Sequence, residues 1–218
     1  MADRCLLYYI TDRSQLQGDE PARRRALLAK IAEVARAGVD YIQLREKDLG
    51  ARQLEALARE AVAAVRKGSS STHLLINSRT DVALAAGADG VHLRSKDVSP
   101  EEVRRIWAEC SAGALAREKP CIAASCHVRG DVDRAQSGAA DFAVFAPVFG
   151  KRNASGTQPA GLAALQEACR AKIPVLALGG VTLENAASCL NAGAAGVAGI
   201  RLFQENKIED VVRALRAL

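Results

Sequence analysis

One stretch of this 218-residue chain has the residue types and spacing of an anion-binding site. Gln43, Arg45 and Lys47 alternate with other residues at the end of a short apolar segment. On an extended strand, side chains two residues apart share a face, so Gln43 and Arg45 should point together, with Lys47 following on the loop. The arginine fork and the lysine ammonium both bind phosphate oxygens. We expect these residues to bind a phosphorylated group, the alternative being an ordinary charged loop.

Two further polar groups follow apolar segments. Asn77 ends one segment, and Asp97 follows another that contains His92. Asp97 is a candidate Mg²⁺ ligand, because Mg²⁺ favours one or two carboxylates together with substrate phosphate oxygens. Its alternative roles are a helix cap or a solvent-facing carboxylate. His92 falls within the segment, and we expect it to be a hydrogen-bonded core histidine.

Ser125 and His127 share one side of the next extended segment. His127 has the chemistry to transfer a proton or to donate to a phosphate. A serine hydrolase would need a G-x-S-x-G elbow, which this sequence lacks. Beyond the following segment, the polar and glycine-containing residues 150–157 predict a lid, and Lys151 is a candidate contact to the substrate phosphate.

The strongest local signal is the pair Gly179 and Gly180, which follows an apolar segment close to the C-terminus. Glycines let backbone N–H groups approach a phosphate closely, particularly next to a helix N-terminus. Ile200 and Arg201 follow the last apolar segment in the corresponding place. We expect these four residues to bind a substrate phosphate, and a tight turn at the glycines is the alternative.

The elements that position these residues follow from an alternating pattern. Strand-length apolar segments are separated by segments with helical spacing of apolar residues, such as 21–37 and 51–67. Helices are also expected to start at Pro100 and Thr182, and the last helix spans 208–218. The predicted strands are 6–10, 41–44, 74–77, 90–93, 121–125, 142–145, 175–178 and 197–200.

Eight strands that alternate with helices predict a parallel sheet, because each crossover between parallel strands needs a connection of helical length. The G-x-G-x-x-G fingerprint of an open dinucleotide-binding sheet is absent. We therefore predict the α/β class, with residues 1–218 forming a single (β/α)₈ TIM barrel. Its active site should lie at the C-terminal ends of the strands, where the polar groups described above occur.

A short repeat precedes four of the predicted strands, with glycines at positions 38, 87, 138 and 193. Each repeat reads as a helix end, a glycine turn and a strand entry. Glycine adopts the left-handed cap conformation without a Cβ clash. We expect all four glycines to serve stability at the opposite face of the barrel.

Composition narrows the choice of partners and location. Aromatic residues make up only 4% of the chain, which argues against a stacking platform for nucleic acids. The net charge of +5 agrees weakly with small anionic substrates. Six cysteines without a CxxC pair indicate reduced packing residues in a cytoplasmic protein, and no apolar run has membrane-spanning length. A homodimer is possible, although no feature of the sequence points to one.

The ordered set of motifs resembles the thiamine phosphate synthase and thiazole tautomerase family across nearly the whole chain. The motifs are the segments 9–12, 43–47, 75–77, 87–93, 125–127, 146–149 and 178–182. The resemblance implies a synthase that joins hydroxymethylpyrimidine diphosphate to a thiazole phosphate and releases diphosphate. Gln43, Arg45, Lys47 and Asn77 would hold the diphosphate, Asp97 would hold Mg²⁺, Ser125 would contact the leaving group and Gly180 would anchor the thiazole phosphate.

The sequence departs from the synthase pattern at several positions. Ser78 stands where a second Mg²⁺-binding aspartate is usual, and Arg94-Ser95 replaces the usual Gly-Gln. The loss of one carboxylate should weaken Mg²⁺ binding, and Arg94 or Lys96 would then supply part of the metal's charge. Lys151 is the nearest counterpart of the lysine in the synthase lid, and Arg201 replaces a usual Ser or Thr.

Three functions remain open on this basis. The first is a thiamine phosphate synthase, which is a transferase. The second is a thiazole tautomerase, an isomerase in which His127 would be the acid and base. The third is a non-catalytic protein that binds a phosphorylated ligand. Asp97 and the Gln-x-Arg-x-Lys sequence that begins at Gln43 favour the first.

Overall fold

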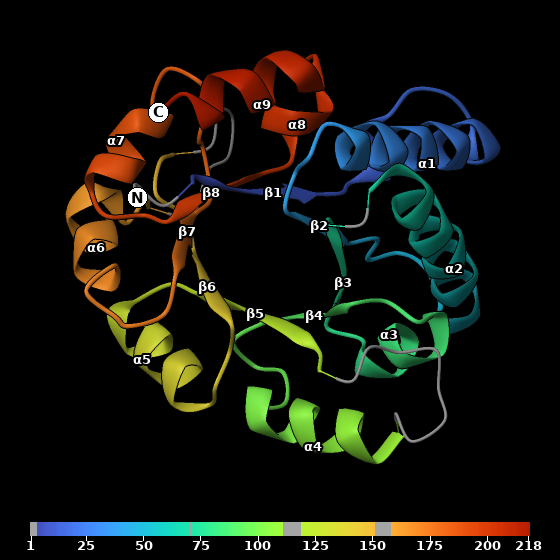
Figure 1. The fold of residues 1–218 in the computed structure, drawn as a ribbon, viewed down its shortest axis with the longest axis horizontal. Coiled ribbons are helices and arrows are strands. Elements are labelled where there is room, and N and C mark those ends of the chain that lie inside the picture. Colours follow the sequence, from blue (N-terminus) through green and yellow to red (C-terminus); the bar gives the residue numbers. More distant parts are fainter. Residues whose placement is uncertain (1–3, 70, 111–118, 151–157) are drawn as a thin grey trace.

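The computed structural model describes residues 4–69, 71–110, 119–150 and 158–218. Eight parallel strands form a closed barrel in chain order, and the helices surround it (Figure 1). This confirms the predicted fold class. The strands are β1 (Leu6–Ile10), β2 (Tyr41–Leu44), β3 (His73–Asn77), β4 (Gly90–Leu93), β5 (Cys121–Cys126), β6 (Phe142–Phe145), β7 (Val175–Ala177) and β8 (Gly196–Gly199).

The helices in the described part of the chain lie in the crossovers between strands and after β8. They are η1 (Arg13–Gln15), α1 (Glu20–Arg36), α2 (Ala51–Gly68), α3 (Thr80–Ala86), α4 (Pro100–Cys110), α5 (Arg129–Ser137), α6 (Gly161–Ala168), α7 (Ala186–Asn191), α8 (Arg201–Gln204) and α9 (Ile208–Arg216). None of them combines the length and apolar character that a membrane span requires. All six cysteines are free, as predicted, but Cys110 is exposed, so the prediction that all six are packing residues is wrong there.

Alternate residues along the strands face the interior of the barrel, and the others face the surrounding helices. The interior layer is small and aromatic-rich, with Tyr8 and Phe142 in edge-to-face contact. Its buried members are Tyr8, Ile10, Leu75, Ala123, Phe142, Val144, Leu176 and Ala198. Because side chains alternate with period two, the next inward positions toward the strand ends lie directly above this layer.

Helix starts follow local capping chemistry. At α4, the Ser99 hydroxyl accepts from the Glu102 N–H and the Glu102 carboxylate accepts from the Ser99 N–H, so Pro100 starts the helix as predicted. The predicted helix start at Thr182 is wrong. Asn185 accepts from the Thr182 N–H and donates to the Gly180 carbonyl, which makes residues 180–185 a turn, and α7 begins at Ala186.

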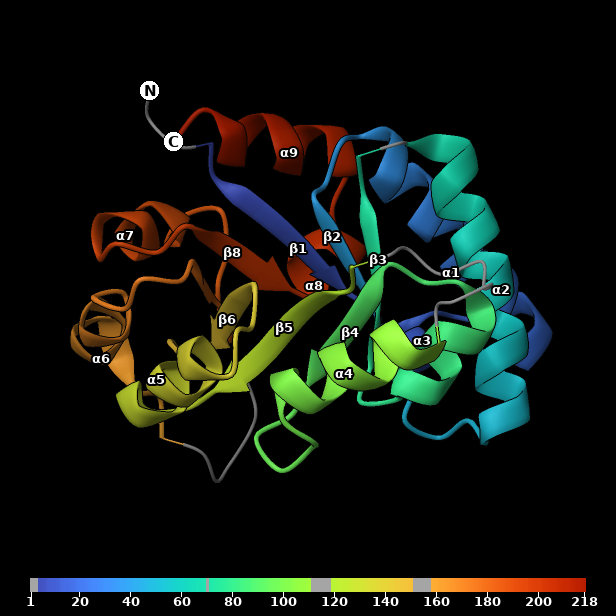
Figure 2. The same ribbon diagram turned by 60° about the horizontal axis from the view of Figure 1, so that its bottom comes forward.

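Each copy of the repeat stands between a helix and the strand that follows it, and Figure 2 shows these elements from a second side. In three copies an aspartate accepts from the backbone N–H of a residue on the neighbouring strand: Asp40 from Leu7, Asp89 from Leu74 and Asp141 from Ile122. The left-handed residue stands two positions before the aspartate. It is Gly38 and Gly87 in the first two copies, but Ala139 in the third.

The expectation for Gly138 is therefore wrong, because this glycine has a φ of −79°. The third copy has one more residue between its glycine and its aspartate than the first two copies. That insertion moves the left-handed position from Gly138 to Ala139, whose φ is 60°. The fourth glycine, Gly193, does adopt a left-handed conformation, with a φ of 96°.

Candidate active site

A cavity of about 420 Å³ opens at the C-terminal ends of the strands. The residues of its wall are the inward-facing positions nearest the strand ends. Gln43 lies in β2 and Arg45 directly after it, Asn77 ends β3, and Ser125 lies near the end of β5. Among the described residues, the lining is Ile10, Gln43, Arg45, Lys47, Asn77, His92, Arg94, Ser125, His127, Val144, Ala146, Pro147, Leu178, Gly179 and Ile200. The face predicted for the active site is thus where the polar residues converge.

Most residues predicted for the site line this cavity. They are Gln43, Arg45, Lys47, Asn77, Ser125, His127, Gly179 and Ile200. Gly180, Arg201 and Asp97 are outside its lining, and Arg201 is exposed at the start of α8. Lys151 and the predicted lid beyond Gly150 lie outside the described residues.

Basic and amide side chains gather on one part of the wall. Arg45 is half-buried and Lys47 is exposed at the mouth, while Gln43 and Asn77 come from the adjoining strands β2 and β3. None of the described residues forms an ion pair with the Arg45 guanidinium. A guanidinium at the edge of a cavity that is not engaged by a carboxylate of the described residues can bind an anionic ligand group.

A series of hydrogen bonds joins Tyr8, below the cavity, to Gln43, His92 and Ser125 in the cavity wall. Gln43 Nε2 donates to the Tyr8 hydroxyl at 3.2 Å, and this hydroxyl lies 3.0 Å from His92 Nδ1. His92 Nε2 lies 2.7 Å from Ser125 Oγ. Since the Tyr8 oxygen accepts from Gln43, its proton is directed to Nδ1, and the Nε2 hydrogen is directed to Ser125. The Ser125 hydroxyl hydrogen is then left for a ligand in the cavity.

Burial sets the protonation states of His92 and Tyr8 in this series of hydrogen bonds. Burial lowers the pKa of His92 to about 3, with a further contribution from the nearby Arg45 charge. Burial likewise raises the pKa of Tyr8 well above its usual value. A neutral imidazole and a neutral phenol are what the hydrogen-bond directions require. The expected core histidine is confirmed, and it also lines the cavity.

His127 belongs to the exposed mouth of the cavity. Its Nδ1 lies 2.7 Å from the carbonyl oxygen of Ala146. A carbonyl oxygen only accepts hydrogen bonds, so Nδ1 carries the hydrogen, and Nε2 is the ring nitrogen left to exchange a proton. His127 therefore has an acceptor nitrogen for proton transfer at the rim.

The two glycines after β7 are required by a close approach of the loop that follows β6. A Cβ on Gly179, whose φ is +97°, would lie 2.8 Å from Pro147 Cα. A Cβ on Gly180, whose φ is +66°, would lie 2.8 Å from the Gly150 carbonyl oxygen. The glycines thus form a tight turn, which was the alternative to phosphate binding, and their phosphate role stays a prediction.

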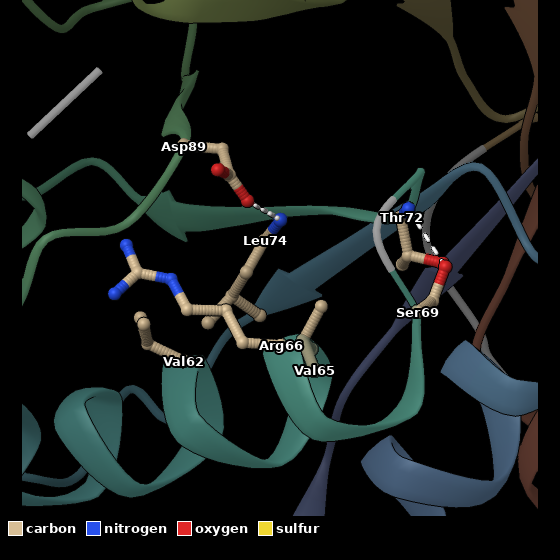
Figure 3. Close-up of a pocket in the computed structure, with 7 residues that line it drawn as sticks. All are labelled: Val62, Val65, Arg66, Ser69, Thr72, Leu74 and Asp89. Carbon is tan, nitrogen blue, oxygen red and sulfur yellow. Dashed lines mark hydrogen bonds between the residues drawn. The ribbon is translucent and has the colours of Figure 1, made fainter.

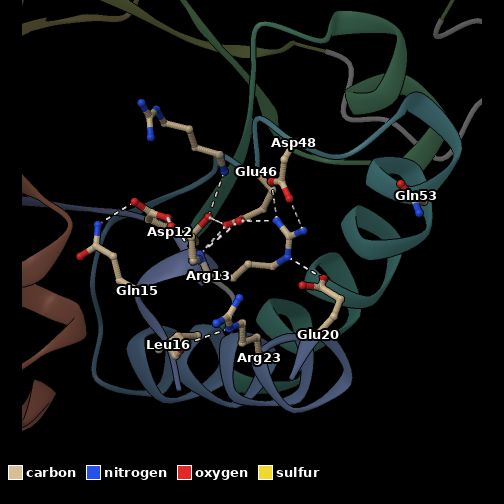
Figure 4. A network of polar contacts seen from close by, with 12 residues as sticks. Asp12, Arg13, Gln15, Leu16, Glu20, Arg23, Glu46, Asp48 and Gln53 are labelled. Carbon is tan, nitrogen blue, oxygen red and sulfur yellow. Dashed lines mark hydrogen bonds and ion pairs between the residues drawn. The ribbon is translucent and has the colours of Figure 1, made fainter. Parts of the chain in front are cut away.

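The loop that carries Arg45 and Lys47 is fixed by the residue between them (Figure 4). The buried Glu46 carboxylate accepts from the Thr11 hydroxyl at 2.6 Å and pairs with Arg13 at 3.0 Å. Arg13 also pairs with Asp48 at 2.7 Å and Glu20 at 2.7 Å.

The backbone of the loop is held as well, because the Arg45 N–H donates to the Thr11 hydroxyl at 2.9 Å. Burial raises the pKa of Glu46, and the hydrogen bonds from Thr11 and Arg13 oppose that rise. Sequence reasoning missed this support. The signal was an acidic residue, Glu46, inside a run of cations, which indicates a partner elsewhere in the chain.

The donor set around Asp97 does not fit a magnesium ion. Arg94 lines the cavity, and its guanidinium Nη2 lies 2.9 Å from Asp97 Oδ1. Burial by itself raises the pKa of Asp97, but hydrogen bonds from Arg94 and Ser78 lower it overall. The carboxylate is therefore charged and already engaged by donors of the chain. In the described residues, no group of three or more histidine, cysteine or acidic side chains is placed to bind a metal.

A second cavity of about 280 Å³ lies between α2 and the strands β3 and β4 (Figure 3). Its polar groups are already used in the fold. Arg66 donates to the Gly87 carbonyl, Asp89 accepts from the Leu74 N–H, and the Thr72 hydroxyl donates to the Val39 carbonyl. These are contacts of the N-terminal face of the barrel, where residues serve stability.

Comparison with known proteins agrees with this site. Residues 7–203 match the family model described as thiamine monophosphate synthase. A putative thiamine-phosphate synthase of Geobacter sulfurreducens is 41% identical, over 97% of this chain and 93% of the relative. A thiamine-phosphate synthase of Syntrophomonas wolfei is 35% identical, over 97% and 95% of the two chains.

A solved structure supports the same assignment. Thiamine phosphate pyrophosphorylase from Pyrococcus furiosus superposes with a TM-score of 0.78 at 25% sequence identity. The superposition covers 99% of this chain and 95% of that chain. The match of the family model, the relatives and the fold extends over the strands that build the cavity. The chain belongs to the thiamine monophosphate synthase family.

Proposed function

We propose that this chain is a thiamine phosphate synthase, which joins hydroxymethylpyrimidine diphosphate to a thiazole phosphate and releases diphosphate. One observation carries the proposal: the wall of the cavity is divided by chemistry. Arg45 and Lys47 after β2 and Arg94 after β4 supply positive charge, whereas Ile10, Val144, Leu178 and Ile200 supply apolar surface. A charged diphosphate and two aromatic rings match these two parts of the wall.

The reaction requires that the bond between the pyrimidine methylene carbon and the diphosphate oxygen breaks. Its electron pair leaves with the diphosphate, and the lone pair of the thiazole nitrogen forms the new carbon–nitrogen bond. Negative charge therefore develops on the leaving oxygen. Fixed donors placed at that position stabilise the transition state more than the ground state.

Two groups of this chain are placed to act on the leaving diphosphate. The Arg45 guanidinium supplies a fixed positive charge. The Ser125 hydroxyl is supported from below by His92, so its hydrogen is directed away from the imidazole. We assign Arg45 to binding of the diphosphate and Ser125 to donation of a hydrogen bond to the oxygen that departs.

The proposal is tested by mixing both substrates with the protein and measuring thiamine phosphate and diphosphate. Equal amounts of the two products are expected. Arg45→Gln should lower kcat/KM by roughly 10²-fold, as for the loss of one oxyanion-binding donor. Arg59→Gln is the matched control, because Arg59 pairs with Glu55 on α2, outside the cavity, and it should leave turnover unchanged. Absence of product from the folded protein would reject the synthase.

A thiazole tautomerase is the second candidate, and His127 favours it. The acceptor nitrogen of His127 lies at the rim, where it can move a proton on a bound thiazole carboxylate phosphate. His127→Ala should then abolish the proton shift. A tautomerase rate that survives this substitution would remove His127 from that role. Binding of thiazole phosphate without turnover of either kind would indicate a non-catalytic binding protein.

The partners and location follow from the same proposal. The cationic wall is suited to small phosphorylated molecules, and six free cysteines suit a reducing compartment such as the cytoplasm.

A further inference from the structure

Arg94 is a cationic group on the wall of the cavity, and Asp97 lies behind it. Both the backbone and the side chain of Arg94 contact this carboxylate. The Arg94 N–H donates to Asp97 Oδ2 at 2.8 Å, and Nη2 donates to Oδ1 at 2.9 Å. Asp97 in turn donates its own N–H to the Arg94 carbonyl at 3.0 Å. The guanidinium is thus positioned by a short loop, 94–97, whose first and last residues hydrogen-bond each other.

The carboxylate has little capacity left for a cation. Both Asp97 oxygens accept from Arg94, and Ser78 contributes a further hydrogen bond. The Asp97 side chain is only 10% exposed, whereas that of Arg94 is 62% exposed. A divalent cation could reach Asp97 only after the guanidinium had been displaced. Ser78 adds no second carboxylate that would favour this exchange.

The guanidinium, by contrast, has capacity left for an anion. Arginine carries five N–H hydrogens, and Asp97 engages only Nε and one hydrogen of Nη2. Nη1 and the second Nη2 hydrogen are left for a ligand. Arg45 and Lys47 line the same cavity, so three cationic side chains surround the space in which an anion would bind.

We propose that Arg94 binds the diphosphate directly and takes the place of a divalent cation, so that this enzyme binds its diphosphate without Mg²⁺. The identity of the anion rests on the proposed function. The role of the guanidinium rests on its position between Asp97 and the cavity. The charge of Arg94 also stays in place after the diphosphate departs, so no metal has to be bound again before the next turnover.

Binding of inorganic diphosphate, measured by titration calorimetry on metal-free protein and again with Mg²⁺, tests the proposal. After correction for the Mg²⁺–diphosphate complex in solution, the wild-type Kd should be the same in both conditions. Arg94→Ala should weaken metal-free binding about tenfold, the loss expected for one charge-assisted contact. Arg170→Ala is the matched control, because Arg170 has similar exposure and pairs with Glu167 outside the cavity; it should bind as the wild type does.

A double variant, Ser78→Asp with Arg94→Gly, tests the converse, which is that a metal can replace the guanidinium. It supplies a second carboxylate and removes the guanidinium, so diphosphate binding should become Mg²⁺-dependent. Mn²⁺ binding to the double variant, but not to the wild type, should appear in electron paramagnetic resonance spectra. Aspartate tolerates the left-handed φ of 63° at position 78 better than most residues.

Three results would overturn the proposal. They are wild-type binding that requires Mg²⁺, an Arg94→Ala variant with unchanged affinity, and a double variant that binds diphosphate without metal as tightly as the wild type. Failure of the proposed function would look different. In that case the binding results would hold while thiamine phosphate failed to form.

Discussion

His92 shows how one buried side chain sets the chemistry of the residues around it. The imidazole bridges Tyr8 and Ser125, and it does so as a neutral ring. Its position on β4 was readable from the sequence, since it stands within an apolar segment. Its partners were not, because Tyr8 and Ser125 come from strands that only the closed barrel brings together.

This protonation state has a consequence for stability. The folded pKa of His92 is about 3, whereas a histidine in the unfolded chain titrates near 6.5. As the pH falls below about 6.5, the unfolded state binds a proton that the folded state excludes. The free energy of unfolding is therefore fully retained above that pH and decreases between about 6.5 and 3.

We expect His92 alone to remove about 1.4 kcal/mol of unfolding free energy per pH unit below pH 6. His92→Gln should lack this part of the slope in urea unfolding measured between pH 7 and about pH 4. His127→Gln, at an exposed histidine, should retain it. An identical slope in the wild type and His92→Gln would contradict the neutral buried imidazole.

Whether a residue of the site could be predicted from the sequence depends on how far it lies from a strand. Gln43, Asn77 and Ser125 were predictable because alternation continues to the strand ends, and Arg45 because it continues one residue past β2. Gly180, Arg201 and Asp97 were predicted for the site but do not line the cavity. They lie on turns and on a short helix, where the direction of a side chain depends on loop geometry that no period describes.

At the scale of elements, the connection after β1 supports the loop after β2. Arg13 of η1 and Glu46 form an ion pair whose side chains are 5% and 2% exposed. This pair fixes the backbone between the two predicted phosphate-binding cations. Its loss should therefore affect both stability and substrate binding.

Arg13→Gln should lower the free energy of unfolding by about 3 kcal/mol, because it leaves the Glu46 carboxylate buried without its partner. KM for the diphosphate substrate should rise in the same variant. Arg24→Gln is the matched control, since Arg24 and Glu60 form a more exposed pair between α1 and α2, and it should cost less than about 1 kcal/mol. Equal losses in urea unfolding would argue against a buried role for Arg13.

The turn between α5 and β6 contains the one repeat whose left-handed residue carries a Cβ. Replacing Ala139 by glycine should raise the free energy of unfolding by about 0.5 to 1 kcal/mol, because the φ of 60° is unfavourable for alanine. Ala37→Gly is the control at an equivalent helix end with a φ of −74°, and it should destabilise. A destabilised Ala139→Gly variant in thermal unfolding would contradict the observed backbone.

The strand bounds were predicted to within one residue, because apolar runs and period-two alternation are local signals. The start of α7 was predicted wrongly, because Thr182 resembles a helix cap. The Asn185 side chain instead stabilises a turn, and the helix begins after it. The shifted position of Ala139 likewise depends on the aspartate that follows it, which must reach the N–H of Ile122 on the neighbouring strand.

In the whole molecule, seven crossovers between consecutive strands bring residues that are far apart in the chain to one mouth of the barrel. Alternation of strands and helices predicted this architecture from the sequence alone. The closure is completed by β1 and β8, which pair directly, and by Arg216 of α9, which binds Asp40 at 2.8 Å. The result is one cavity in which cations and apolar residues occupy different parts of the wall.

The reaction assigned to this cavity forms a carbon–nitrogen bond. The most direct measurement compares two rates on one protein preparation: coupling of the pyrimidine diphosphate to thiazole phosphate, and tautomerisation of thiazole carboxylate phosphate. We predict that coupling yields thiamine phosphate and diphosphate in equal amounts, with kcat/KM well above that of the proton shift. A fast proton shift without any thiamine phosphate would contradict the account and identify the chain as a tautomerase.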